Sequence, residues 1–358
     1  MLKRLLQTKR ESRMSKKARK NALVLSGGGG RGAYHVGVLK FLEEHEWYPH
    51  IVAGTSIGAV NGAAIASGHN ANSLWALWRR LQTDDVQKAG LGALTGNYLL
   101  DTAPLRKTLQ EKGWVNFERL NSDEAAVHLR VTATEIGSGQ LHIFGNSADV
   151  YPSKMQQEPI GLDHIIASCS IPIVYPATQL NDNLYWDGAT VANTPLGPAI
   201  DAGAEEIVVV MMTPWETAEE RKLEKPSNIL QAASTMLEWA LLASFQSDLK
   251  MFHRINELVR LQVENGRLRA QNALLLSQIR GEELDLKDED GNGIPDIFEN
   301  KFHELPDPII VAPKEAIPVE RILRYTQEGH ETLYRMGYED AKRAWRAAGK
   351  EVEGEGNP

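Results

Sequence analysis

The sequence predicts an α/β fold in which helices cover both faces of a β-sheet, with a helical insertion late in the chain. Short apolar runs alternate with stretches of helical periodicity, and this alternation is typical of such a fold. The 358 residues are 42% hydrophobic and 24% charged, which is enough for a sizeable core and excludes a disordered, collagen-like or repeat protein. The expected strands are residues 22–25, 51–53, 127–134, 141–144, 184–186, 207–212 and 309–311.

Residues 1–20 form a basic arm that we expect to be disordered. The arm holds nine basic side chains and one acidic one, so it carries +8 and leaves −16 for the rest of the chain. Such a stretch can contact an anionic membrane surface, and a solvated arm or a transit peptide are the alternatives. We expect no nucleic-acid partner.

Cysteine usage and hydropathy restrict the class of protein further. Cys169 is the only cysteine, which excludes an internal disulfide, a secreted disulfide scaffold and a cysteine-rich zinc module. No secretory signal or membrane-spanning segment is evident, which favours a cytoplasmic protein that is peripheral to a membrane.

Residues 228–279 predict one long helix that carries a heptad seam. Seven positions alternate at spacings of three and four residues: Leu258, Leu261, Asn265, Leu268, Asn272, Leu275 and Ile279. Asparagine in such a seam can fix register and oligomeric state, whereas Gly266 disfavours a helix interior. Two interpretations remain, a helix packed on its own domain and a homo-oligomer formed through residues 256–280.

Ser56 is the candidate nucleophile, because Gly54-Thr55-Ser56-Ile57-Gly58 fits G-x-S-x-G between a predicted strand and a predicted helix. A sharp turn there would strain the serine backbone, and Gly54 and Gly58 would leave room for it. The helix N-terminus would direct N–H groups at a developing oxyanion. A tight structural turn is the alternative.

A glycine cluster at residues 27–32 follows the first predicted strand and exposes backbone N–H groups that suit an anion. A phosphate loop would need a Gly-Lys-Ser/Thr ending, and a dinucleotide loop would need an acidic residue after the next strand. An oxyanion hole uses this cluster and Ser56 together. Its candidate residues are Gly27, Gly28, Gly29, Gly30, Arg31 and Gly32.

Asp187 is the candidate base, at the end of a short aromatic strand and before Gly188. Burial would be needed to raise the pKa of this carboxyl from about 3.9. We expect the late histidines, His253, His303 and His330, to be surface or capping residues.

Together these motifs resemble the patatin-like phospholipases, whose motifs are G-G-G-x-R/K-G, G-x-S-x-G and D-G-A/G in this order. Residues 167–172 are similar to the family's Ser-x-x-x-Pro turn region. The resemblance covers residues 21–255 and 305–347 and implies a three-layer α/β/α catalytic domain. It also implies a Ser56–Asp187 dyad without histidine, a lipid acyl ester as substrate and no metal in catalysis.

A calcium-binding loop is predicted within an insertion at residues 256–304, ahead of a frayed tail at 348–358. Oxygen ligands stand at positions 1, 3, 5, 9 and 12 with glycine at position 6, as in EF-hand loops, and the Gly-Ile-Pro-Asp stretch is similar to thrombospondin type 3 loops. The predicted ligands are Asp288, Asp290, Asn292, Ile294, Asp296 and Glu299. An acidic solvated turn is the alternative, and any calcium would be structural or regulatory.

The sequence therefore predicts a serine hydrolase that cleaves acyl esters of phospholipids or lysophospholipids. The alternative is a calcium-responsive assembly protein whose hydrolase site is vestigial.

Overall fold

The computed structural model describes residues 20–90, 98–151, 153–215, 229–281, 287, 294–298 and 302–351. The chain divides into two compact units. Unit 1 comprises Met1–Phe245 and Asp307–Pro358, and unit 2 comprises Gln246–Pro306. Among the described residues, no helix combines the length and the hydrophobicity that a membrane-spanning segment needs.

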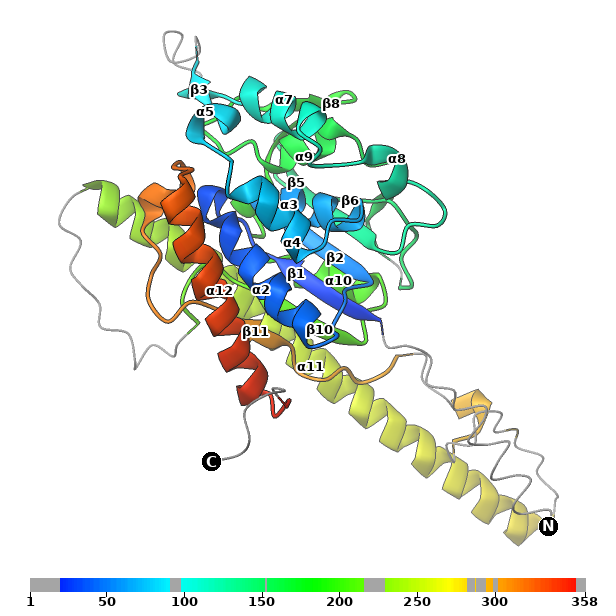
Figure 1. The fold of residues 1–358 in the computed structure, drawn as a ribbon. Helices are drawn as coiled ribbons and strands as arrows, with labels where there is room; N and C mark the ends of the chain where they lie inside the picture. Colours follow the sequence, from blue (N-terminus) through cyan, green and yellow to red (C-terminus); the bar gives the residue numbers. More distant parts are fainter. Residues whose placement is uncertain are drawn as a thin grey trace, which may run out of the picture. The chain divides into compact units, whose positions relative to one another are not determined.

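Unit 1 is built on a sheet in which the described residues supply nine strands (Figure 1). Its main path runs β11-β10-β1-β2-β5-β6-β7, with β9 paired to β5 and β8 paired to β9. The five strands from β11 to β5 are parallel, whereas β6 and β9 run antiparallel to β5. The strands of this sheet are β1 (Asn21–Leu25), β2 (Ile51–Thr55), β5 (His128–Glu135), β6 (Leu141–Gly145), β7 (Gln156–Gln157), β8 (Thr178–Leu180), β9 (Asn183–Asp187), β10 (Glu206–Val210) and β11 (Ile309–Val311).

Helices cover both faces of this sheet, α2, α3 and α12 on one face and α10 on the other (Figure 1). The backbones of α2 and α12 touch where two glycines meet: a Cβ on Gly37 would lie 1.9 Å from the Tyr334 carbonyl oxygen, and one on Gly337 would lie 2.1 Å from that of Tyr34. The main helices are α2 (Ala33–Glu44), α3 (Ile57–Ala66), α4 (Ala71–Trp78), α7 (Ala103–Glu111), α9 (Leu162–Ser168), α10 (Leu196–Asp201), α11 (Ile229–Arg280) and α12 (Gln327–Ala347). Shorter elements are η1 (Gly29–Gly32), α5 (Thr83–Val86), β3 (Lys88–Ala89), β4 (Leu100–Asp101), α8 (Phe117–Leu120), η2 (Gly188–Thr190), η3 (Asp296–Phe298) and η4 (Val319–Ile322).

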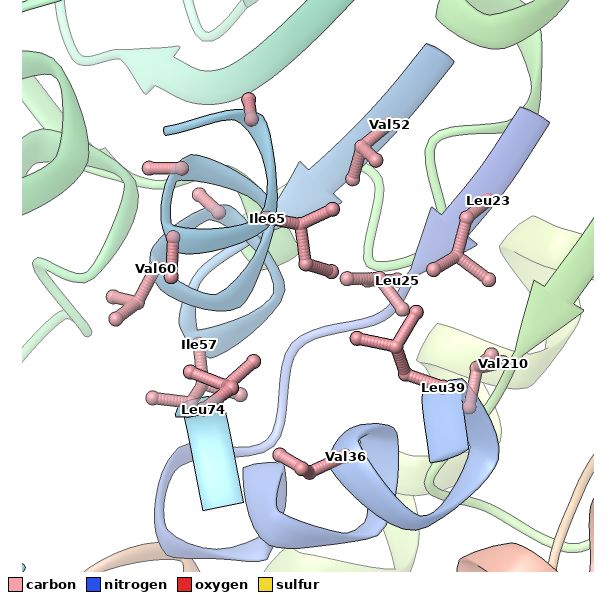
Figure 2. Close-up of a cluster of buried hydrophobic side chains, with 14 of the residues drawn as sticks. Leu23, Leu25, Val36, Leu39, Val52, Ile57, Val60, Ile65, Leu74 and Val210 are labelled. Carbon is pink, nitrogen blue, oxygen red and sulfur yellow. The ribbon is translucent and has the colours of Figure 1, made fainter. Parts of the chain in front are cut away.

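The core lies between the sheet and the helices that follow β1 and β2. Leu25 and Val52 of the sheet meet Leu39 of α2 and Ile65 of α3 (Figure 2), and the cluster is almost wholly buried. Strands buried on both faces read as continuous apolar runs, which is why β1, β2 and β10 were recognisable in the sequence. The predicted α/β fold with helices on both faces is confirmed.

Candidate functional site

Ser56 occupies a strained turn between β2 and α3. Its backbone angles are φ 57° and ψ −126°, a conformation that side-chain-bearing residues rarely adopt. The neighbouring glycines allow this turn: a Cβ on Gly54 would lie 2.3 Å from the Gly58 carbonyl oxygen, and one on Gly58 would lie 2.2 Å from that of Leu25. The turn therefore requires glycine at both places.

Strand pairing brings Asp187 to Ser56 across 131 positions of sequence. Thr55 at the end of β2 pairs with Thr132 of β5, and Asp187 at the end of β9 pairs with the next residue, Ala133. Strand β9 thus continues along the edge of β5 just beyond the end of β2. The side chains of Ser56 and Asp187 lie next to each other there, and they are 4% and 2% exposed.

Burial gives Asp187 the chemistry of a weak acid. It raises the pKa of the Asp187 carboxyl to about 7, although hydrogen bonds from Ser56 and from the Ala189 amide lower it. The Ala189 amide donates to Oδ1 at 2.8 Å, so this oxygen is held in place. A carboxylate with such a pKa is a much better proton acceptor near neutral pH than an exposed aspartate.

Residues 168–170 contact both Ser56 and Asp187. Ser168 Oγ accepts a hydrogen bond from the Ser56 amide at 2.8 Å, and the Ser170 carbonyl oxygen accepts one from the Asp187 amide at 2.9 Å. Cys169 between them lies beside Ser56, and burial raises the pKa of its thiol well above the usual range. The sequence marked this segment only through its Ser-x-x-x-Pro resemblance and assigned no contact to Ser56.

The glycine cluster lies directly against Ser56, but its amides differ in their partners. A Cβ on Gly27 would lie 3.1 Å from Ser56 Cβ. The Gly27 amide donates to Asn193, to Oδ1 at 3.0 Å and to the carbonyl oxygen at 3.2 Å. Within the described residues, the amides of Gly28 and Gly29 donate no hydrogen bond, so these two are free to donate to an incoming oxyanion.

Arg31 and Gly32 have structural contacts. Arg31 is buried, and its guanidinium donates to the carbonyl oxygens of Gly28 at 3.4 Å and Met212 at 3.5 Å. A Cβ on Gly32 would lie 2.5 Å from Ile57 Cγ1, which explains this glycine as a close approach to α3. Asn193, which the sequence did not single out, is the further side chain that anchors the cluster.

A narrow cavity of about 30 Å³ lies beside Ser56. Its wall is mostly apolar and includes Ile57, Val60, Leu81, Val86, Leu105 and Trp114. This volume holds about two water molecules, so an acyl chain can enter only if the wall moves.

One part of that wall is a covering segment, residues 322–325, which runs from the last residue of η4 toward α12. Ile322 and Tyr325 line the cavity, and a Cβ on Gly29 would lie 2.2 Å from the Ile322 carbonyl oxygen. Gln87 Nε2 donates to the Leu323 carbonyl oxygen at 2.8 Å, and Thr83 Oγ1 accepts from the Tyr325 amide at 3.1 Å. These bonds hold the segment over the glycine cluster.

The three late histidines differ in their exposure to solvent. His253 and His303 are exposed as expected, but the prediction was wrong for His330, which is 1% exposed and packs edge-on against Trp78. Burial lowers the pKa of His330 to about 4.

The predicted calcium loop lies mostly outside the described residues. Asp288, Asp290, Asn292 and Glu299 are not among them, whereas Ile294 is buried and Asp296 begins η3. The described residues contain no cluster of metal-ligating side chains.

Comparison with known proteins identifies the domain. Residues 23–200 match the family described as Patatin-like phospholipase. The chain is 28% identical over 192 residues to lysophospholipase NTE1 of Cryptococcus neoformans, which covers 52% of this chain and 11% of that protein. It is 48% identical over 48 residues to triacylglycerol lipase SDP1L of Arabidopsis thaliana, covering 13% of this chain and 6% of the lipase.

The chain thus spans about a tenth of the NTE1 protein that it matches. Among solved structures, VipD from Legionella pneumophila aligns with a TM-score of 0.42 at 14% identity, covering 92% of this chain and 67% of that one. The family match contains the glycine cluster, Ser56 and Asp187 in one stretch. Residues 23–200 of this chain therefore form a patatin-like phospholipase domain.

Proposed function

We propose that this domain hydrolyses acyl esters of phospholipids or lysophospholipids through a Ser56–Asp187 dyad. The observation that carries the proposal is the burial of these two side chains next to each other, which raises the pKa of the Asp187 carboxyl to about 7. The wall of the cavity beside Ser56 is mostly apolar, which suits an acyl chain once the wall moves, and the names of the relatives point to lipid esters as substrates.

The reaction takes place in two halves. Asp187 accepts the hydroxyl proton as Ser56 Oγ attacks the ester carbonyl, and the amides of Gly28 and Gly29 stabilise the oxyanion. Asp187 then gives its proton to the departing lysolipid or alcohol, which leaves an acyl-serine. In the second half, Asp187 takes a proton from water as the water oxygen attacks the acyl carbon. Asp187 then returns this proton to Ser56 Oγ as the bond from Oγ to the acyl carbon breaks, which releases the fatty acid.

The remaining parts of the site position these groups. Ser168 holds the Ser56 backbone, Asn193 holds the first glycine of the cluster, and Arg31 ties that cluster to Met212, just after β10. The basic arm at residues 1–20 would bring the domain to an anionic, cytoplasm-facing membrane surface where its substrates reside.

The test is fatty-acid release from lysophospholipid micelles, phospholipid vesicles and triacylglycerol emulsions. Ser56→Ala and Asp187→Asn should each lower turnover at least about 1,000-fold while the thermal unfolding transition is retained. Ser67→Ala is the matched control for serine, since Ser67 is buried at the other end of α3. Asp182→Asn, an exposed site between β8 and β9, is the control for aspartate.

Unchanged turnover in either dyad variant would contradict the mechanism. A folded wild-type protein without activity on any of the three substrates would instead favour the assembly hypothesis, in which the hydrolase site is vestigial.

A further inference from the structure

Within unit 2, one face of helix α11 is already occupied. Its buried positions recur at spacings of three, four and seven residues, which places them on one face, and they are Phe252, Asn256, Val259, Gly266, Ala270 and Ser277. Asn256 exchanges two hydrogen bonds with the Leu305 backbone, at 2.8 and 3.1 Å. A Cβ on Gly266 would lie 2.7 Å from the Phe298 carbonyl oxygen. The close approach of the backbone at Phe298 therefore explains Gly266, and this glycine does not interrupt the heptad seam.

The heptad seam lies on the opposite face of α11. Leu268 of the seam and Ala270 of the buried face are two positions apart, about 200° around a helix of 3.6 residues per turn. Leu268 is 53% exposed, whereas Ala270 is 4% exposed. All seven seam residues are exposed, five of them large apolar side chains. Among the described residues of unit 2, those that bury α11 lie against the opposite face, which leaves the seam available to a second copy of the chain.

We propose that two copies of this chain associate through the heptad seam as a parallel, in-register, two-stranded coiled coil. Leu258, Asn265, Asn272 and Ile279 take the a positions, and Leu261, Leu268 and Leu275 take the d positions. Leucine at d favours two-stranded coils, and asparagine at a restricts register and strand number. The seam from residue 258 to residue 279 is about 33 Å long, or three heptads.

The asparagines determine the orientation. In a parallel, in-register pair, each a position faces the same a position of the other chain. Asn265 therefore meets the partner's Asn265, and Asn272 meets the partner's Asn272. Each amide then finds an amide as hydrogen-bond partner. An antiparallel pair would place each asparagine against a leucine and bury its amide unsatisfied, which costs free energy.

The flanking charges agree with this orientation. Glu264 is at position g and Arg269 is at position e of the next heptad, the two places that face each other across a parallel coil. Neither side chain forms an ion pair within the described part of the chain. Two symmetric Glu264–Arg269 pairs would therefore form in the dimer.

The first test is the mass of the full chain in solution, by sedimentation velocity across the micromolar range. We expect twice the monomer mass of 39.7 kDa. Leu268→Lys should weaken the dimer about 100-fold or more, because it removes two buried leucines and buries two charges. Leu274→Lys is the matched control, since Leu274 is 48% exposed on the same helix but lies at position c, outside the seam.

The second test fixes orientation by disulfide cross-linking. The native Cys169 is buried, so the chain offers a clean background for new thiols. Asn265→Cys should cross-link two chains on mild oxidation, whereas Leu274→Cys should not. A monomeric wild type, a dimer that tolerates Leu268→Lys but not Leu274→Lys, or a dimer without the cross-link at position 265 would each overturn the proposal. None of these readouts depends on hydrolase activity.

Discussion

Replacing Asp187 with asparagine should stabilise the folded protein in alkaline solution. The Asp187 carboxyl has a pKa of about 7 in the fold because it is buried, whereas its usual value is 3.8. Between these two values the folded state holds a proton that the unfolded chain releases. The free energy of unfolding therefore falls as pH rises through this window.

The magnitude follows from the two pKa values. A difference of about 3 pKa units corresponds to about 4 kcal/mol, all of it lost from the wild type above pH 7. Asparagine carries no such charge and keeps an oxygen for the Ala189 amide. The advantage of Asp187→Asn should grow by about 3 kcal/mol between about pH 5 and pH 8.

The assay is urea unfolding of both proteins at several pH values. Asp182→Asn, an exposed position on the same hairpin, should leave the wild-type curve unchanged. If the difference between Asp187→Asn and the wild type stays constant with pH, the carboxyl is not buried as described, and the reasoning about its basicity fails.

Three further outcomes are expected. Turnover should fall about tenfold per pH unit below pH 7, because a protonated Asp187 cannot accept the serine proton, and a flat profile of fatty-acid release would contradict this. Ser168→Ala should lower kcat about 10- to 100-fold with little change in KM, because the Ser56 amide loses its hydrogen-bond acceptor. An equal loss of kcat in the control variant Ser170→Ala would instead indicate a general disruption of the segment. Gln87→Ala should release residues 322–325 and therefore lower KM more for long-chain esters than for short-chain esters. An equal change of KM for both kinds of ester would argue against a covering role of this segment.

The sequence was informative where chemistry and burial leave a local pattern. Strands β1 and β2 were recognisable as apolar runs, and the turn at Ser56 was recognisable from its flanking glycines. The short strand β8 was missed because it has only three residues and an exposed centre, so it shows no apolar run. The prediction for His330 was wrong because its burial beside Trp78 depends on helix α12, near the end of the chain, packing against α2. Such a long-range contact leaves no local pattern in the sequence.

The contacts that hold the site together were also hidden. Ser168 meets Ser56 from 112 positions away, and Asn193 meets Gly27 from 166 positions away. Serine and asparagine are common in loops for many reasons, so their types alone gave no reason to select them. Such partners emerge only once the order and register of the strands are known.

The pairing of β1 with β10 determines how much of the chain a folded fragment must include. The family match ends at residue 200, but β10 hydrogen-bonds along the whole of β1, from Asn21 to Leu25, and α12 lies across α2. A fragment cut at residue 200 would turn β1, an interior strand of the sheet, into a bare apolar edge that could pair with other molecules. Aggregation on expression of such a fragment would thus reflect a missing neighbour strand, even though the glycine cluster, Ser56 and Asp187 are all present.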